Sequence, residues 1–297
     1  MAEAEELERT AAAIARRLAP PAAEALGAEL AARAPAEGMA WLEEQLSAAR
    51  AGDRAAVRKA FPGMGRRLGR GSFGSGAALA RPDGTGDVPL AGWRIDDAGR
   101  AALLIALPEG RDELARDLYY SGDLRERTGV LRALAVAGEG ETALDAVRDA
   151  CRANARELFE AAVADNPYAS AGLTDNEFRQ AVLKSVFLGV PLERIARLDR
   201  RADPELTRML LSYVTEREMA VRAVPPDIWP VAGRAPIPGT VARLVGYLEH
   251  PQAAHRAGAA RGLGISGDPR GRPFLEERLP READESVRAA IVRALAP

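Results

Sequence analysis

The segment AHRAGAARGL, residues 254–263, returns 32 residues later as SVRAAIVRAL, residues 286–295, and ERTGVLRAL at residues 126–134 is similar to both. In each copy small and branched residues fall on one helix face, and two arginines stand five positions apart. Helical hairpins of the HEAT type stack in this way, because each hairpin covers the apolar face of its neighbour. The repeat therefore predicts an all-α chain whose helical hairpins stack as a HEAT-like α-solenoid, although HEAT repeats are usually longer, roughly 40 residues.

The rest of the chain also has the composition of a helical protein. Alanine, leucine, arginine and glutamate dominate and are good helix formers, whereas aromatic residues make up only 5% of the sequence. Glycine and proline are frequent in residues 62–95, which predicts one long loop, and we expect no strand. The predicted parts are N-terminal helices at residues 1–61, this Gly/Pro-rich loop at residues 62–95, a helical core at residues 96–232 and HEAT-like C-terminal helices at residues 238–297, within one continuous domain.

Local signals predict where several helices begin and end. Pro20-Pro21 separates two helical segments near the N-terminus, and Gly52 separates the next two, because proline and glycine interrupt helices. The predicted capping groups are Asp53, Asp96 with Asp97, Thr174 with Glu177 as a capping box, and Asp203 before Pro204.

The segment GRGSFGSG, residues 69–76, satisfies the G-x-G-x-x-G pattern of nucleotide-binding loops. Such a loop needs a strand before it and a strand or helix after it. The preceding residues instead predict a short helix ended by Pro62 and Gly63, and the following residues form turns. The chain contains only two lysines, Lys59 and Lys184, and no HRD or DFG tripeptide. We therefore interpret the segment as a surface loop and expect no cofactor.

Charge, cysteine and histidine content exclude several other classes of protein. The 41 basic and 43 acidic residues give a net charge of −2, so no general attraction to nucleic acid is expected, although local arginine clusters still bind anions. The single Cys151 fits a reducing compartment. His250 and His255 stand five residues apart, on different faces of a helix, so no metal site is expected. The acidic N-terminus and the absence of a long apolar run predict a cytoplasmic protein without a membrane span.

Polar residues of interest gather in the middle of the chain. Asn166-Pro167-Tyr168 is a turn signal that can fix the amide and the hydroxyl at a helix end. Lys184 lies in an apolar run and either extends to water or acts as a point charge in a site. Arg200-Arg201 with Asp199 either binds an anion or pairs with neighbouring carboxylates, Asp203 and Glu205. The candidate ligand-binding residues are Arg152, Asn154, Asn166, Tyr168, Lys184, Asp199, Arg200, Arg201 and Arg217.

The chain resembles the EboA family. The resemblance is carried by GWRIDDAGRAALLIAL at residues 92–107, CRANARELFEAAVADNPY at residues 151–168 and QAVLKSVFLGVPLERIARLDRRADPEL at residues 180–206, with YVTERE and PPDIW further on. The order NPY, VLK, LDRRA is a specific signature. In the family a Trp-Asn-Gln run usually stands where this chain has Phe178-Arg179-Gln180, a proline where it has Ala169, and an asparagine where it has Asp203. If the family's asparagine amides contact a ligand, these replacements remove that contact here.

The resemblance implies a role in metabolite traffic. Members are similar to proteins encoded beside a UbiA-type prenyltransferase, a sugar-phosphate cyclase and TIM-barrel proteins, in operons that move natural-product precursors out of the cytoplasm. It implies an accessory protein of such a pathway, which recognises a small polar metabolite or a partner enzyme. Two alternatives stay open: an enzyme that acts on a cyclitol or prenylated cyclitol through Lys184, Tyr168 and the arginines, and a protein-binding scaffold. A ligand site requires Asn154, Asn166, Tyr168, Lys184 and Arg200 to converge in one pocket.

Overall fold

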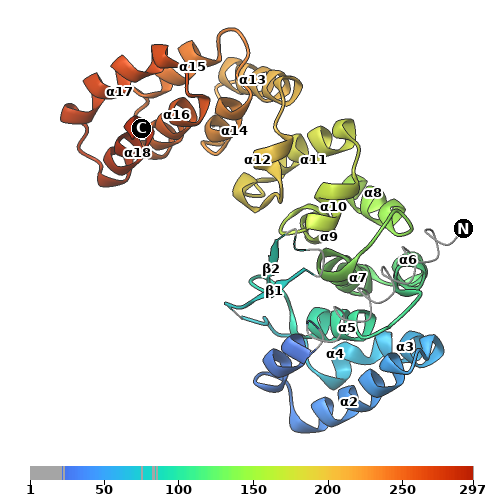
Figure 1. Cartoon of the computed structure of the whole chain (residues 1–297). Helices are drawn as coiled ribbons and strands as arrows, with labels where there is room; N and C mark the ends of the chain where they lie inside the picture. Colours follow the sequence, from blue (N-terminus) through green and yellow to red (C-terminus); the bar gives the residue numbers. More distant parts are fainter. Residues whose placement is uncertain (1–21, 23, 75, 82–83, 85, 297) are drawn as a thin grey trace, which may run out of the picture. The chain divides into compact units, whose positions relative to one another are not determined.

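The computed structural model describes residues 22, 24–74, 76–81, 84 and 86–296. The chain forms two compact units, Met1–Thr174 and Asp175–Pro297. The boundary between them falls inside the segment 96–232. Pro20-Pro21 and the first of the two helices predicted around it lie outside the described residues, whereas residues 24–31, in the second of them, are helical as predicted. In both units helices dominate the described residues, as the sequence predicts (Figure 1).

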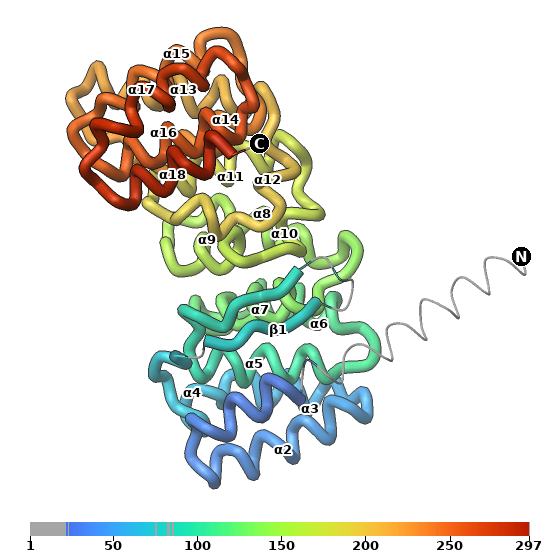
Figure 2. Tube along the Cα trace, turned by 60° about the vertical axis from the view of Figure 1, so that its left-hand side comes forward, coloured from blue at the N-terminus to red at the C-terminus, as the bar shows by residue number. Residues whose placement is uncertain are grey.

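The first unit is centred on two buried helices, α5 and α7, which pack side by side (Figures 1 and 2). Every residue of α5 from Asp96 to Ile105 is buried, and so is every residue of α7 from Thr128 to Ala137. A helix without a solvent-exposed face belongs to the centre of a core. The elements are α2 Ala36–Arg50, α3 Arg54–Ala60, the 3-10 turn η1 Phe61–Gly63, α4 Met64–Arg67, β1 Ala78–Ala80, β2 Asp87–Pro89, α5 Ile95–Ile105, α6 Arg111–Ser121, α7 Leu124–Ala137, α8 Leu144–Arg152, α9 Arg156–Val163 and α10 Pro167–Gly172.

The expectation that the chain contains no strand is wrong in the glycine-rich segment. Strands β1 and β2 pair antiparallel, with Leu79 opposite Val88, and both of these side chains are buried. Before the hairpin, the Phe73 ring is buried and its backbone N–H donates to the carbonyl of Trp93 at 2.8 Å. The G-x-G-x-x-G segment is thus anchored by a buried aromatic residue and packed against the start of α5.

Three of the predicted helix boundaries are confirmed, those at Gly52, Asp53 and Asp203. The break between α2 and α3 lies at Gly52, whose φ of +83° is easy only for glycine. Asp53 accepts a hydrogen bond from the Ala56 N–H at 2.9 Å, and Asp203 accepts one from the Leu206 N–H at 2.8 Å. Pro62 and Gly63 do not end the helical path, because η1 continues it into α4.

The second unit contains the repeat from which the fold was predicted. The repeat copy at residues 254–263 lies in α16 and the copy at residues 286–295 in α18, and these two helices pack side by side (Figure 2). Helix α16 also packs on α14, so each helix covers a neighbour as in a HEAT-like stack. The elements are α11 Asp175–Leu188, η2 Leu192–Arg194, α12 Leu198–Arg201, α13 Pro204–Met219, α14 Ile228–Arg234, α15 Thr240–Tyr247, α16 Ala253–Ser266, η3 Pro269–Gly271, α17 Arg272–Arg278, η4 Leu279–Arg281 and α18 Glu285–Leu295.

Candidate functional site

The asparagine of the NPY turn has a structural role in the first unit. Asn166 is fully buried and is the N-cap of α10. Its Oδ1 accepts a hydrogen bond from the Ala169 N–H at 3.0 Å, and its Nδ2 donates to the Ala161 carbonyl at 3.2 Å. Both ends of the amide are therefore engaged by backbone. Two other candidates of this unit, Arg152 and Asn154, are exposed.

Tyr168 is buried in the first turn of α10 and has an unusual hydroxyl environment. The ring lies against Gly138, where a Cβ atom would approach it to 2.9 Å. The hydroxyl faces the Ala143 backbone but makes no hydrogen bond of normal geometry in the described part of the chain. Burial raises the pKa of this phenol above its ordinary value of 10.0. Burial also raises the pKa of the nearby Asp112 carboxyl to about 6, so this corner of the unit disfavours charge.

In the second unit two candidate residues from different helices line one groove, which we call the α11–α13 groove. Helix α11 contributes Gln180, Leu183, Lys184 and Phe187, which share one helix face, and α13 contributes Tyr213, Glu216 and Arg217, with Arg222 just beyond its end. The groove has a volume of about 380 Å³. Lys184 and Arg217 therefore meet around one cavity, although 33 positions separate them in the sequence.

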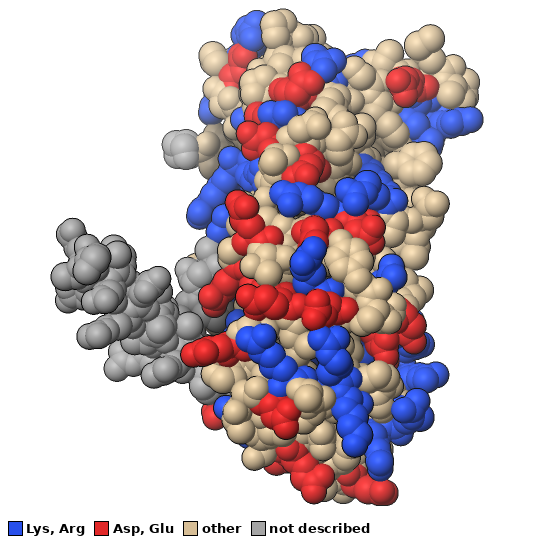
Figure 3. All heavy atoms as spheres, turned by 90° about the vertical axis from the view of Figure 1, so that its right-hand side faces the viewer, with Lys and Arg blue, Asp and Glu red and all other residues tan. Residues whose placement is uncertain are grey.

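Charge in the α11–α13 groove is predominantly positive. Lys184, Arg217 and Arg222 oppose the single carboxylate of Glu216, which leaves a net charge of +2 among the lining residues. Arg217 is held in place, because its Nε donates to the Ala223 carbonyl at 2.9 Å and its guanidinium lies 5.9 Å from the centre of the Tyr213 ring. On the face shown in Figure 3, by contrast, basic and acidic side chains are interspersed. The groove is thus suited to an anionic or polyhydroxylated ligand.

The arginine cluster near α12 lies apart from the residues that line this groove. Arg201 pairs with Asp175 at 2.7 Å, and its guanidinium stacks over the Phe178 ring at 4.3 Å. Arg200 is exposed, whereas Asp199 contributes to a different cavity of about 580 Å³ near η2 and α14.

Arg179 of α11 and Asp203, the N-cap of α13, face each other. Arg179 donates from its Nε to Asp203 Oδ2 at 3.0 Å, and its Nη2 contacts the same carboxylate. This hydrogen-bonded arginine lowers the pKa of the Asp203 carboxyl. Glu205 in turn pairs with Arg208. Arg179 and Asp203 therefore form one ion pair between α11 and the start of α13.

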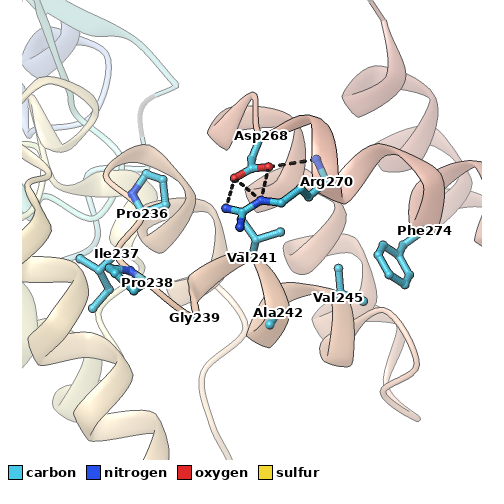
Figure 4. Close-up of a pocket in the computed structure, with 10 residues that line it drawn as sticks. All are labelled: Pro236, Ile237, Pro238, Gly239, Val241, Ala242, Val245, Asp268, Arg270 and Phe274. Carbon is cyan, nitrogen blue, oxygen red and sulfur yellow. Dashed lines mark hydrogen bonds and ion pairs between the residues drawn. The ribbon is translucent and has the colours of Figure 1, made fainter.

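A second groove of the same unit, the α15–α17 groove, is mostly apolar and has a volume of about 600 Å³ (Figure 4). Its apolar lining consists of Pro236, Ile237, Pro238, Val241, Ala242, Val245 and Phe274. The ion pair between Asp268 and Arg270 closes one wall, and hydrogen bonds from Arg270 lower the pKa of Asp268 to about 2. These contacts leave the groove suited to apolar side chains.

A buried charged cluster at the start of α5 was missed by the sequence reasoning. Asp96 is fully buried, and its Oδ2 lies 2.8 Å from Arg100 Nη1 and 3.5 Å from Arg125 Nη1. Burial, and then the charge of Asp96, raise the pKa of the adjacent Asp97 to about 6. Asp96 Oδ1 and the indole N–H of Trp93 have no hydrogen-bond partner within the described ranges. The sequence signal for this cluster is the pair of carboxylates in the first turn of an apolar helix. From the sequence alone, these carboxylates were interpreted only as helix caps.

The prediction that the two histidines lie on different helix faces is wrong. Helix α16 begins at Ala253, so His250 precedes it, and the His250 and His255 rings lie 4.1 Å apart. His255 Nδ1 accepts a hydrogen bond from the Trp229 indole N–H at 2.9 Å, and burial lowers its pKa to about 4. No group of three metal-ligating side chains occurs among the residues that the structure describes.

Comparisons with known proteins address both units. A family model described as metabolite traffic protein EboA matches residues 22–233, and a model of HEAT repeats matches residues 217–296. The predicted HEAT-like character of the C-terminal helices is thereby confirmed. Neither the curated proteins nor the solved structures contain a match to this chain. In the part of the chain that the structure covers, no helix combines the length and apolar character needed to cross a bilayer.

Proposed function

Because the chain belongs to the EboA family of metabolite traffic proteins, we propose that it binds a small polar metabolite with an anionic group in the α11–α13 groove. The observation that carries this proposal is the meeting of Lys184 and Arg217, from two helices, around one cavity. A volume of about 380 Å³ suits a small ligand. Three cations against one carboxylate favour an anion, and Tyr213 and Gln180 add hydrogen-bonding groups for hydroxyls.

The proposed site is smaller than the one that the sequence predicts. Asn166 and Tyr168 belong to the first unit, and the amide of Asn166 is already engaged. Their convergence with Lys184 stays a prediction, as do the roles of Arg152, Asn154, Asp199, Arg200 and Arg201. The partner enzymes that the resemblance implies, a UbiA-type prenyltransferase and a sugar-phosphate cyclase, remain part of the proposal, as do an accessory role in that pathway and a cytoplasmic location.

Replacing Lys184 with methionine is expected to separate ligand binding from folding. Lys184 is half-buried, and methionine keeps most of its aliphatic stem, so the free energy of unfolding should change by less than about 1 kcal/mol. Export of the pathway's metabolite from cells should fall, because a charge-assisted hydrogen bond contributes about 1.5–3 kcal/mol. Urea unfolding and quantification of exported metabolite measure the two effects.

The matched control is Lys59→Met, which replaces the other lysine, exposed on α3. It should leave export unchanged. If Lys184→Met also leaves export unchanged, Lys184 is a surface residue and the proposed site loses a central group; if it unfolds the protein, its role is structural.

A second candidate function, a protein-binding scaffold, is favoured by the α15–α17 groove. Its apolar lining and the half-exposed Phe274 suit the side chains of a partner protein better than a polar metabolite. An enzymatic role on a cyclitol stays a prediction of the sequence alone.

A further inference from the structure

Three large apolar side chains stand unusually exposed at the ends of the helices that form the α11–α13 groove. Phe187 is 71% exposed, Met219 81% and Val221 94%. The other exposed large apolar side chains of the described residues reach at most 56%. Phe187 itself lines the groove, and Met219 and Val221 lie between two lining residues, Arg217 and Arg222. We call these three side chains the apolar rim. Such exposure is unfavourable in water and marks an interaction surface.

The turn that carries Val221 holds this side chain outward in a strained conformation. Val221 has a φ of +53°, which is rare and strained for a β-branched residue. Hydrogen bonds fix the turn, from the Arg222 N–H to the Arg217 carbonyl at 2.8 Å and from the Val221 N–H to the Glu218 carbonyl at 3.0 Å. Glycine would adopt the same φ without strain. The turn therefore presents valine where local backbone preference alone favours glycine.

Positive charge accompanies the apolar rim. Lys184, Arg217 and Arg222 line the groove beside it, with Glu216 as the one carboxylate of the lining. The carboxylate of Glu218, on the same turn, is neutralised by Arg243 at 2.5 Å and accepts a hydrogen bond from the Tyr247 hydroxyl at 2.7 Å. Exposed apolar side chains flanked by cations are the combination that binds the interface of a membrane with anionic headgroups.

We propose that the apolar rim docks on the surface of a bilayer that contains anionic phospholipids. Phe187, Met219 and Val221 insert at the level of the headgroups, while Arg217 and Arg222 contact phosphate groups. This places the mouth of the α11–α13 groove at a membrane surface. The inference goes beyond the proposed metabolite binding and does not require it, because the rim side chains and the vesicle surface are sufficient for the contact.

Co-sedimentation of the full-length protein with vesicles tests the proposal. Vesicles of phosphatidylcholine alone are compared with vesicles that contain equal parts of phosphatidylcholine and phosphatidylglycerol. Wild type should bind the anionic vesicles at least about fivefold more tightly than the neutral ones, since each cation near an anionic surface changes the affinity by roughly that factor. The triple variant Phe187→Ser, Met219→Ser and Val221→Ser should bind the anionic vesicles at least about tenfold more weakly.

The matched control is Val292→Ser, which removes the exposed apolar side chain of α18 and should bind as wild type does. Circular dichroism and a melting curve confirm that each variant folds. Binding of wild type to neither vesicle, or equal binding by the triple variant, would overturn the proposal. Self-association in sedimentation velocity that the triple variant abolishes, without vesicle binding, would also overturn it and assign the rim to a second copy.

Discussion

Replacing Asp96 with alanine is expected to destabilise the first unit by about 3–5 kcal/mol, because it leaves a buried arginine without its counter-charge. Arg100 has only 4% of its side chain exposed, and its Nη1 lies 2.8 Å from Asp96 Oδ2. The Arg100 Nε donates only a long hydrogen bond, 3.3 Å, to the Phe61 carbonyl. The loss should appear in urea unfolding and as faster hydrogen exchange of the α5 and α7 amides.

The control for this variant is Asp117→Ala. Asp117 also pairs with an arginine, Arg58, but both side chains are about half exposed, so the change should be less than about 1 kcal/mol. The double variant Asp96→Leu with Arg100→Met should be more stable than Asp96→Ala, since an apolar pair replaces both charges. Equal effects of Asp96→Ala and Asp117→Ala would contradict the buried pair as a determinant of stability.

Replacing Gly233 with alanine is expected to destabilise the second unit by about 1–3 kcal/mol or more, because two helix backbones would have to separate. A Cβ atom at Gly233 would lie 2.2 Å from the Gly262 carbonyl oxygen, and one at Gly262 would lie 2.5 Å from the Trp229 carbonyl oxygen. Backbone atoms cannot move aside as a flexible side chain does. Helices α14 and α16 thus touch through glycine, and hydrogen exchange in these two helices should report the loss.

Gly246→Ala is the matched control for this close approach. Gly246 lies inside α15, and a Cβ atom at this position would have no heavy atom of the described chain within 4 Å beyond its own helix backbone and chain neighbours. Alanine should therefore stabilise the protein by up to about 1 kcal/mol, through its higher helix propensity. If Gly233→Ala leaves the free energy of unfolding unchanged, α14 and α16 do not pack as closely as the distance of 2.2 Å indicates.

The parts of the fold that were predicted from the sequence are those that local chemistry decides. The caps Asp53 and Asp203 accept hydrogen bonds from amides three residues further along the chain. The break at Gly52 depends only on the positive φ that glycine adopts easily. The repeat in α16 and α18 was likewise predictable, because the spacing of its small residues and arginines is visible in the sequence itself. The β1–β2 hairpin was not predicted, because three-residue strands are too short for an alternation to stand out.

The sequence predicted which residue types could form the candidate site, but not how they are arranged in space. Lys184 stands out as a rare lysine in an apolar run, but its meeting with Arg217 depends on how α11 packs against α13. The ion pairs of Asp96 could not be predicted, because they depend on which arginines lie next to it in the folded core. The two histidines were misplaced because the start of α16, between them, decides whether their rings face each other.

The proposal that the α11–α13 groove holds a small anionic metabolite can be checked by native mass spectrometry of the protein purified from cells that make the pathway's metabolites. Wild type and the Lys59→Met control should carry a small-molecule adduct. The double variant Lys184→Met with Arg217→Met should lose it, since two charge-assisted contacts of about 1.5–3 kcal/mol each are removed. An adduct of equal occupancy on the double variant, or no adduct on wild type, would contradict metabolite binding in this groove.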